Sequence, residues 1–390
     1  MKVLYIVSSF PRNEKDTYVR WLLENVKRLS EKNVEITVLA PSYKGLKNHN
    51  FGNIKVKRFR YFFKKWEDLT HEGGMAVKLK NPFYTLVFLF YFISGFLNTI
   101  KICKKEKFDI IHVHWPFPHA LWAYKAAKIN NSKVVLTFYA VELLMIKKKF
   151  KFLKKTLLSI INKADKIITF SSYIQELLRE LSRKEVTLIP YGITIKEKKY
   201  KKVNNKIKRI LFVGRLVERK GLDYLIEAMP MMLKEINCKL IIIGDGVEER
   251  KLRILVKKYN LDKNVEFLGK VSDERLENEY KNCDTFVLPA IIDSKGETEG
   301  LGVVLIEALC YKKPVIASNV GGIPDVIIDG TTGLLVQEKN TKELSKIIVK
   351  VLKNKRFSEK LGNQGYKYVK KKFDWNKIVD DMYLIYKKVV

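Results

Sequence analysis

The sequence has few cysteines, and their positions exclude two classes of protein. The four are Cys103, Cys238, Cys283 and Cys310. No two of them have the spacing of metal ligands, and a disulfide-stabilised fold needs a denser set. We therefore expect four buried thiols in a reducing compartment.

Acidic residues are scarce beside basic ones. The chain of 390 residues has 75 Lys or Arg against 42 Asp or Glu, a formal net charge of +33. Most of the excess lies in the first 200 residues. Such a charge fits a nucleic-acid partner, an anionic membrane surface or simply a lysine-rich source proteome. Because no helix-turn-helix, zinc-finger or aromatic RNA-binding pattern occurs, we expect no nucleic-acid partner.

Long apolar runs are also rare. Residues Met1 to Ser9 form a short apolar run without a small-residue cleavage site after it, so we expect a first strand rather than a signal peptide. The run from Phe83 to Ile100 has no charged residue and is a membrane-span candidate by length alone. Since it contains several polar residues and many aromatic ones, we expect a buried or interface-lying helix.

Short apolar runs alternate with helical patterns along the whole chain. In the first half, the predicted strands are residues 3–7, 34–40, 54–62, 109–113, 133–137, 166–170 and 186–189. In the second half, they are residues 210–213, 239–243, 265–268, 286–288, 315–317 and 333–336. Strands alternating with helices predict an α/β fold with parallel sheets.

A polar, lysine-rich stretch from Ile195 to Lys208 separates the two halves and is the predicted linker. We expect one domain over residues 1–200 and a second over residues 206–373. Two doubly wound halves predict a ligand cleft between them, at the carboxyl ends of the strands.

Two glutamates, Glu299 and Glu307, bracket a glycine-containing segment that reads as a helix from Gly302. Eight residues of helix advance about 12 Å and rotate about 80°. Both carboxylates would then line one side of a cleft, spaced for an elongated ligand with hydroxyl groups at both ends and an anion between them. Glutamates near a helix start also serve as capping partners, which remains an alternative for Glu299.

Two other segments are expected to contact the anion of this ligand. Arg215 and Lys220 follow the first strand of the second half, where a guanidinium and an ammonium suit a diphosphate. Gly244, Asp245 and Gly246 follow the next strand and bring backbone close to a ligand, unless they form an ordinary strand-to-helix turn.

In order and spacing, these motifs resemble glycosyltransferase family 4. In the second half they are Gly214-Arg215, Lys220-Gly221, Gly244-Asp245-Gly246, Glu299-Gly300-Leu301-Gly302, Glu307-Ala308 and Gly321-Gly322-Ile323-Pro324-Asp325. In the first half they are Ser8-Ser9-Phe10-Pro11-Arg12, Arg58-Phe59-Arg60-Tyr61, Gly73-Gly74-Met75 and Asp109-Ile110-Ile111-His112-Val113-His114-Trp115. The resemblance covers nearly the whole chain.

The resemblance implies a GT-B fold, in which two Rossmann-like doubly wound domains face each other across a cleft. The final helix, residues 374–390, would pack back onto the first domain. It also implies a hexosyltransferase that takes a sugar from a UDP-, GDP- or ADP-sugar with retention of anomeric configuration and without a metal. No Asp-x-Asp occurs in the sequence, which agrees with the expectation of no metal.

Site roles carry over by position. Arg215 and Lys220 would bind the donor diphosphate, and Glu299 the transferred sugar; these three are the predicted catalytic residues. The other predicted donor-binding residues are Glu307 for the ribose, Gly300, Leu301 and Gly302 for backbone contacts, Asp245 and Gly246 beside them, and Gly269, Lys270 and Val271 along the base.

The first domain departs from the family pattern at two places. In the loop after the first strand, many members have a Gly-Gly pair where this chain has Asn13-Glu14-Lys15. Many members carry His-Gly-x-Asp where this chain has Tyr139-Ala140-Val141-Glu142. We place Tyr139 with His114 and Trp115 on the acceptor side. His112 and His114 also fit plain alternating strand positions, one buried and one exposed.

The acceptor is expected to be lipid-linked or a cell-envelope glycan. Residues Lys147 to Lys155 predict a basic helix continuing to Ile161, with an apolar stripe that includes Leu157. This pattern suits an anionic membrane surface, although a solvated helix face explains it equally well. We expect a cytoplasmic protein at the inner face of the membrane. Two alternatives are a non-catalytic nucleotide-sugar-binding subunit and a GT-B nucleotide-sugar epimerase.

Overall fold

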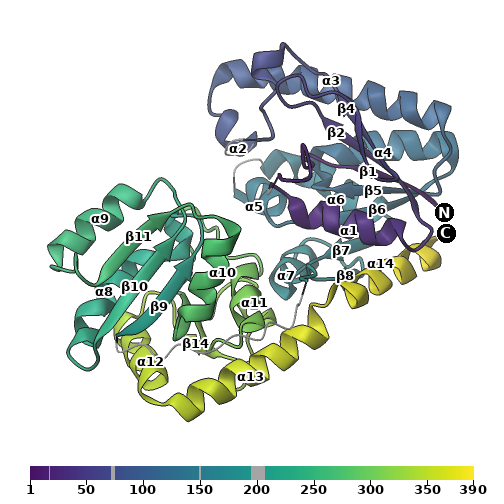
Figure 1. Cartoon of the computed structure of the whole chain (residues 1–390). Helices are drawn as coiled ribbons and strands as arrows, with labels where there is room; N and C mark the ends of the chain where they lie inside the picture. Colours follow the sequence, from purple (N-terminus) through teal and green to yellow (C-terminus); the bar gives the residue numbers. More distant parts are fainter. Residues whose placement is uncertain (17, 72–74, 149–150, 195–206) are drawn as a thin grey trace. The chain divides into compact units, whose positions relative to one another are not determined.

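A computed structural model describes the chain except residues 17, 72–74, 149–150 and 195–206. The described chain divides into two compact units, one made of residues 1–192 with 375–390 and the other of residues 193–374. Most of the predicted linker lies outside the described residues, as do Gly73 and Gly74. Each unit is an α/β layer structure built around a largely parallel sheet (Figure 1).

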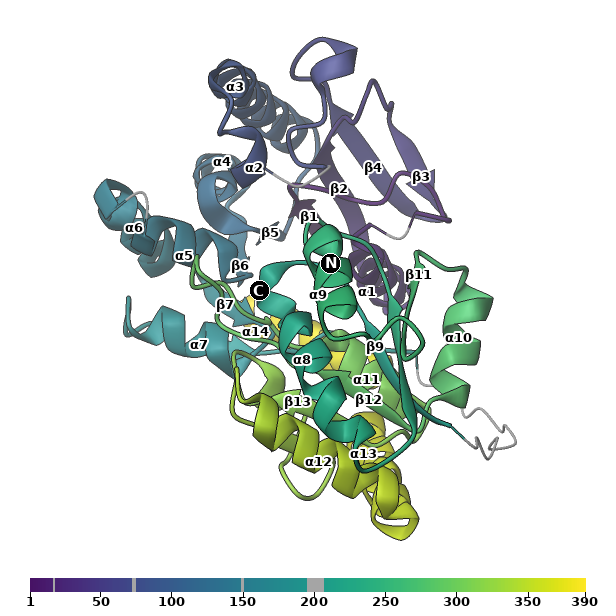
Figure 2. The same ribbon diagram turned by 90° about the vertical axis from the view of Figure 1, so that its left-hand side faces the viewer.

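The strands of the first unit form one sheet in the order β3-β4-β2-β1-β5-β6-β7-β8 over the described residues. Their bounds are β1 (Lys2–Ile6), β2 (Glu35–Pro41), β3 (His49–Phe51), β4 (Ile54–Phe59), β5 (Ile110–His114), β6 (Lys133–Phe138), β7 (Lys166–Thr169) and β8 (Val186–Leu188). In the parallel register, Val3 of β1 lies opposite Ile36 of β2 and Ile110 of β5. Only the edge pair β3 and β4 is antiparallel among the described strands, as Figure 2 shows at the sheet edge.

Helices cover both faces of this sheet. They are α1 (Arg20–Ser30), α2 (Met75–Lys78), α3 (Pro82–Lys105), α4 (Pro116–Asn130), α5 (Val141–Lys148), α6 (Lys154–Lys163), α7 (Ser172–Arg179) and α14 (Trp375–Val389), with 3-10 turns η1 (Lys64–Trp66) and η2 (Lys151–Leu153). The first unit's core therefore combines residues from both ends of the chain, because Ile378 and Tyr386 of α14 pack with Val3 of β1 and Leu22 of α1.

The second unit has a parallel sheet in the order β11-β10-β9-β12-β13-β14. Its strands are β9 (Lys208–Val213), β10 (Cys238–Ile243), β11 (Val265–Gly269), β12 (Thr285–Leu288), β13 (Val315–Ser318) and β14 (Leu334–Val336). Its helices are α8 (Leu222–Leu233), α9 (Glu249–Lys258), α10 (Asp273–Asn282), α11 (Val303–Cys310), α12 (Thr341–Lys353) and α13 (Lys355–Lys372), with 3-10 turns η3 (Glu218–Lys220) and η4 (Ile323–Asp325). The central order β10-β9-β12 is that of a doubly wound sheet, whose switch point lies at the carboxyl end of β9.

The predicted basic helix from Lys147 to Ile161 is wrong. The chain forms α5, the turn η2 and α6 instead, and residues 149–150 lie outside the described part. Lysines at positions 147, 151 and 155 would stack on one helix face, where like charges four residues apart repel. Leu157 of α6 is fully buried in the first unit, whereas Leu153 and Leu158 are half-buried.

Candidate active site

The loops predicted to hold a donor lie side by side at the carboxyl ends of three neighbouring strands. The amide of Gly214, after β9, donates to Ile243 O at 2.9 Å, and Gly244 N, after β10, donates to Gly269 O of β11 at 2.9 Å. Leu216 N also donates to Asp245 O at 2.8 Å. These bonds hold the loops after β9 and β10 against the end of β11.

Lys220 and Glu299 form an ion pair between two motifs that are 79 residues apart in the sequence. Their side chains are only 11% and 16% exposed. Lys220 ends the turn η3 and is followed by Gly221, whose φ is +61°. A Cβ there would lie 1.9 Å from the carbonyl oxygen of Pro289, so this close approach of η3 to the end of β12 requires glycine.

Glu299 is held in its ionised form. Burial by itself would raise the pKa of its carboxyl group, but the charge of Lys220 and the hydrogen bond from its ammonium lower it, with help from the Gly302 amide. The net effect is a pKa below the usual value. The pair therefore places one buried negative and one buried positive group in contact at the carboxyl edge of the sheet.

The helical spacing expected between Glu299 and Glu307 is wrong. Helix α11 begins at Val303, and Gly302 before it has a φ of +83°, in the left-handed region. Glu299 thus precedes the helix in irregular backbone, where its carbonyl accepts a 2.9 Å hydrogen bond from Gly322 N. A turn that needs a left-handed residue breaks the periodicity on which the spacing argument depended.

Glu307 has its own partners within the second unit. Tyr280 of α10 donates to Glu307 Oε2 at 2.8 Å, and the Tyr280 ring stacks on Tyr311 with centroids 5.3 Å apart. Burial raises the pKa of the Glu307 carboxyl group, and the bond from Tyr280 partly offsets this. Glu307 and Tyr280 line a cavity of about 270 Å³ together with Cys310, which is half-buried rather than buried as expected.

The acidic loop between β12 and Glu299 is tied to η3 by contacts that the sequence did not indicate. Glu218 accepts from Ser294 N at 2.9 Å and from Ser294 Oγ at 2.7 Å. Arg219 Nη1 lies 3.6 Å from Glu297 Oε2. The two Glu218–Ser294 bonds fix the loop that carries Glu299 to the turn that carries Lys220, whereas the longer pair with Glu297, whose side chain is 49% exposed, adds little. Tyr280 and Ser294 were missed because single polar residues in a helix or loop carry no periodic signal.

The remaining predicted donor residues differ in how far they are exposed. Asp245 Oδ2 pairs with Lys270 Nζ at 2.9 Å on the surface, and Arg215 is an exposed side chain in the same group of loops. Gly246 is exposed and Val271 half-buried. Gly300 is half-buried, whereas Leu301 is buried in the core of the unit.

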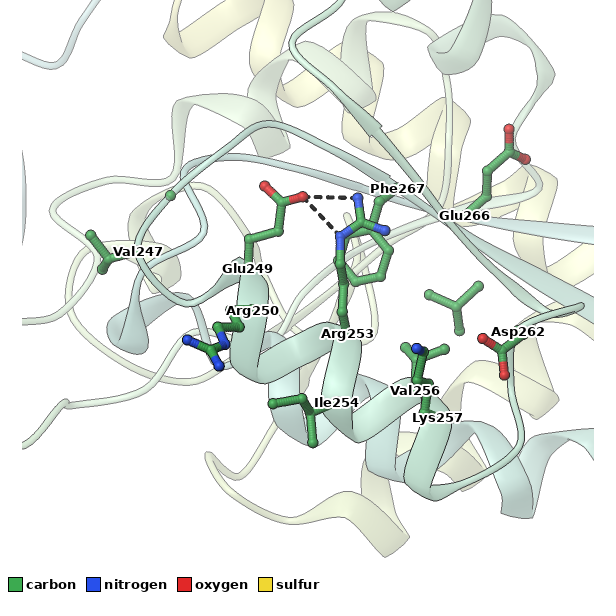
Figure 3. A pocket seen from close by; sticks show the side chains of 12 residues that line it. Val247, Glu249, Arg250, Arg253, Ile254, Val256, Lys257, Asp262, Glu266 and Phe267 are labelled. Atoms are coloured by element: carbon green, nitrogen blue, oxygen red, sulfur yellow. Dashed lines mark hydrogen bonds and ion pairs between the residues drawn. The ribbon is translucent and has the colours of Figure 1, made fainter.

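A separate pocket of about 880 Å³ lies along α9 (Figure 3). In it the Arg253 guanidinium lies over the Phe267 ring, 4.4 Å from the centroid, and binds Glu249 at 2.8 Å. Gly246 is among the residues that line it. Its lining comes from α9, β11 and the loops beside them, whereas Lys220 and Glu299 belong to other loops, so we do not assign it to the donor.

In the first unit, His114, Trp115 and Tyr139 meet at the carboxyl ends of β5 and β6. His114 Nδ1 and the Tyr139 hydroxyl are hydrogen-bonded at 2.5 Å, and Trp115 stacks on Tyr139 with centroids 4.3 Å apart. His114 Nε2 is buried without a hydrogen-bond partner among the described residues. Burial lowers the pKa of His114 and raises that of Tyr139, so both groups stay neutral.

The residues after Tyr139 adopt the geometry of a glycine-containing turn. Ala140 has a φ of +71°, a conformation that glycine adopts readily and alanine rarely. Glu142 Oε1 then accepts from Tyr139 N at 3.0 Å, and burial raises the pKa of Glu142 to about 7. This agrees with the alignment of Tyr139-Ala140-Val141-Glu142 to a His-Gly-x-Asp segment.

The expectation that one of His112 and His114 is exposed is wrong. Both are buried, because β5 is a central parallel strand with both faces covered. His112 bonds to the Tyr386 hydroxyl at 2.5 Å and to Thr137 Oγ1 at 2.7 Å. It is a fully bonded core residue.

Two family models match the chain. Residues 19–197 match "Glycosyltransferase Family 4", and residues 194–368 match "Glycosyl transferases group 1". An uncharacterized glycosyltransferase of Methanocaldococcus jannaschii is 32% identical over 304 residues, which cover 76% of this chain and 81% of that protein. A Corynebacterium glutamicum protein, GDP-mannose-dependent monoacylated alpha-(1-6)-phosphatidylinositol monomannoside mannosyltransferase, is 34% identical over 42% of each chain.

Solved structures have the same fold. Anabaena HepE in complex with UDP matches with a TM-score of 0.76 and 16% sequence identity, covering all of both chains. At that identity the likeness shows the fold alone. It agrees with two Rossmann-like units, each with a parallel sheet.

Proposed function

The chain belongs to glycosyltransferase family 4 and has the GT-B fold, and from this premise we propose that it is a retaining enzyme that uses a nucleotide sugar. Family membership makes it a hexosyltransferase. The proposed acceptor is lipid-linked or a cell-envelope glycan.

One observation carries the proposal most directly, the buried ion pair of Lys220 and Glu299. In a donor complex, Lys220 would turn its charge to the diphosphate while Glu299 accepts from hydroxyl groups of the sugar. A buried carboxylate kept ionised by its neighbour accepts such bonds strongly. Arg215, exposed in the same group of loops, would add a second cation to the diphosphate.

The proposed reaction breaks the bond between the anomeric carbon and a diphosphate oxygen and forms a bond to an acceptor hydroxyl oxygen, whose proton passes to the leaving diphosphate. Negative charge grows on the leaving diphosphate. Lys220 and Arg215 would stabilise it, with backbone amides near Gly300 and Gly302. We propose that no metal takes part, supported by the lack of an Asp-x-Asp sequence.

Two similar proteins guide the choice of donor. HepE was solved with UDP, and the Corynebacterium protein is named as GDP-mannose-dependent. We propose a UDP- or GDP-sugar, with Glu307 on the ribose hydroxyls and Gly269 to Val271 along the base. The strongly basic first unit supports peripheral association with the cytoplasmic face of an anionic membrane.

A second candidate is a non-catalytic subunit that binds the nucleotide sugar. It is favoured by Tyr139, which occupies the position of the family histidine and whose hydroxyl is already bonded to His114. A buried phenol with a raised pKa is a poor proton acceptor.

A thermal-shift screen with UDP-, GDP- and ADP-sugars, followed by assays of the stabilising ones, separates the candidates. The proposed enzyme is stabilised by one donor and releases its nucleoside diphosphate with transfer of the sugar. Stabilisation without release would favour the subunit, and no stabilisation by any nucleotide sugar would contradict both.

A further inference from the structure

Helix α3 presents two opposite faces. Its buried residues recur every three or four positions: Tyr84, Val87, Tyr91, Gly95, Thr99 and Cys103. They pack on the first unit, and α4 is its main partner (Figure 1). A Cβ on Gly95 would lie 2.2 Å from the Trp122 ring, which shows how closely the two helices approach. This face fixes α3 to the unit along its length.

The opposite face of α3 is apolar and exposed. It consists of Phe83, Leu86, Leu89, Phe90, Ile93 and Leu97, which are 37–59% exposed. The helix is long and apolar enough to cross a membrane, and only 28% of its most apolar 18 residues are buried. An exposed apolar stripe of this length is typical of an interaction surface.

Aromatic side chains before α3 extend this stripe. The ring centroid of Phe62 lies 5.9 Å from that of Phe83 and 5.4 Å from that of Phe90. The ring centroids of Trp66, in η1, and Phe83 are 4.7 Å apart. Phe63 beside them is 73% exposed. An open cavity of about 1000 Å³, which we call the aromatic-basic groove, is lined by Lys44, Phe62, Phe63, Lys64, Lys65, Trp66 and Phe83.

The charged side chains that line the groove and flank the stripe are basic. No Asp or Glu occurs in residues 36–66 or 75–105, and exposed lysines flank the apolar stripe at Lys80, Lys101, Lys104 and Lys105. Four described acids border these stretches. Glu67 and Asp68 are buried and bonded to Arg60 and Lys78, Glu35 on β2 pairs with Lys2 and Lys55, and Glu106 follows α3 as a half-buried residue. Apolar residues flanked by lysines and aromatic rings complement the interface of an anionic bilayer.

We propose that the exposed face of α3 and the aromatic-basic groove are the membrane-docking surface of this protein. The stripe enters the acyl boundary with the helix axis in the membrane plane, while Lys64, Lys65 and the flanking lysines contact lipid phosphates. Although α3 is long enough to span a bilayer, its other face is packed on the unit, so it lies on the membrane. This inference deepens the membrane association proposed above and rests on it.

Binding to vesicles of phosphatidylcholine alone and of phosphatidylcholine with equimolar phosphatidylglycerol tests the proposal. The full chain should bind the anionic vesicles preferentially and release at high salt. The double variant Leu89→Glu, Leu97→Glu should bind roughly tenfold or more weakly, because two exposed leucines lose their apolar contact. Leu384→Glu is the matched control: this leucine, on α14 of the same unit, is 52% exposed, as is Leu89.

The variants also distinguish a failed surface from a failed function. All of them should keep the wild-type thermal midpoint and release of nucleoside diphosphate from the donor. Wild-type vesicle binding by the double variant would overturn the α3 surface and leave membrane association standing. If the wild type does not bind vesicles, both the α3 surface and the membrane association are overturned, and the proposed sugar transfer is unaffected. A dimer that only the double variant loses, with vesicle binding unchanged, would show that a second copy covers this face.

Discussion

At the scale of single residues, Lys220 is the cation on which the proposed donor site depends most. Replacing it with methionine removes the partner of a buried carboxylate and a contact to the diphosphate. We expect Lys220→Met to lower kcat/KM for the donor about 10²-fold or more. Steady-state release of nucleoside diphosphate measures this.

Lys251→Met provides the control, since Lys251 is 62% exposed in the same unit and pairs with Asp223 at 3.6 Å. Its kcat/KM should stay within about twofold of wild type, because exposed ion pairs contribute little. Equal losses in the two variants would mean that Lys220 acts only through the general positive charge of the unit.

Glu142 should make the first unit less stable as pH rises. Burial raises its pKa from the ordinary 4.5 to about 7 in the folded chain. Between these values the folded state keeps a proton that the unfolded state has lost, so stability is highest below 4.5 and falls until about 7. The loss is on the order of 3 kcal/mol. Thermal midpoints from about pH 5 to about pH 8 measure it.

Glu142→Gln should remove this part of the pH dependence, because the amide oxygen still accepts from Tyr139 N but does not titrate. If the midpoints of wild type and variant change in parallel over this range, the carboxyl group is not held protonated by burial.

Individual site residues were predictable from the sequence only where they belong to a motif. Lys220 and Glu299 were predicted from motif positions, and the structure brings them into contact. Their donor roles remain predictions. Tyr280 was missed because its function as the partner of Glu307 depends on where α10 lies against α11. His114 was missed as a partner of Tyr139, since a buried pair across two strands depends on sheet register.

At the scale of elements, α14 shows how a terminal helix stabilises a unit far from it in sequence. Tyr386 is fully buried, and its hydroxyl bonds to Tyr5 at 2.6 Å and to His112. Tyr386→Phe should lower the free energy of unfolding by about 1–3 kcal/mol, because it leaves buried polar groups unpaired. Denaturant unfolding followed by tryptophan fluorescence measures this loss.

Tyr383→Phe on the same helix is the control, as Tyr383 is only partly buried. It should cost less than about 0.5 kcal/mol. If Tyr383→Phe lowers the free energy of unfolding as much as Tyr386→Phe does, the buried hydroxyl of Tyr386 is not the cause of the loss.

Element boundaries were predictable where apolar periodicity was strong and failed where charge or turn chemistry intervened. The strand predicted over residues 239–243 matches β10 within a residue. The lysine-rich segment around 147–155 breaks into shorter helices, and the turn before Val303 requires Gly302 in a left-handed conformation. Helix α13 was not predicted, although it continues for 18 residues.

At the scale of the whole molecule, alternating strands and helices were enough to predict two doubly wound units, and the structure confirms this architecture. The alternation repeats over hundreds of residues, so errors in single elements do not change it. Helix α14 contributes to the core of the first unit through contacts with residues far away in the sequence. A local sequence pattern cannot predict such contacts. This packing entered the sequence analysis only through the family resemblance.

The central claim is that this chain transfers a sugar from a nucleotide sugar with the aid of Glu299. The most direct test measures nucleoside diphosphate release from UDP-glucose and GDP-mannose by wild type, Glu299→Gln and Glu297→Gln. Glu297 is the matched control, because it lies two residues away and its side chain is 49% exposed. We predict release by wild type and Glu297→Gln and a loss of about 10²-fold or more in Glu299→Gln. Wild-type release by Glu299→Gln would contradict the account.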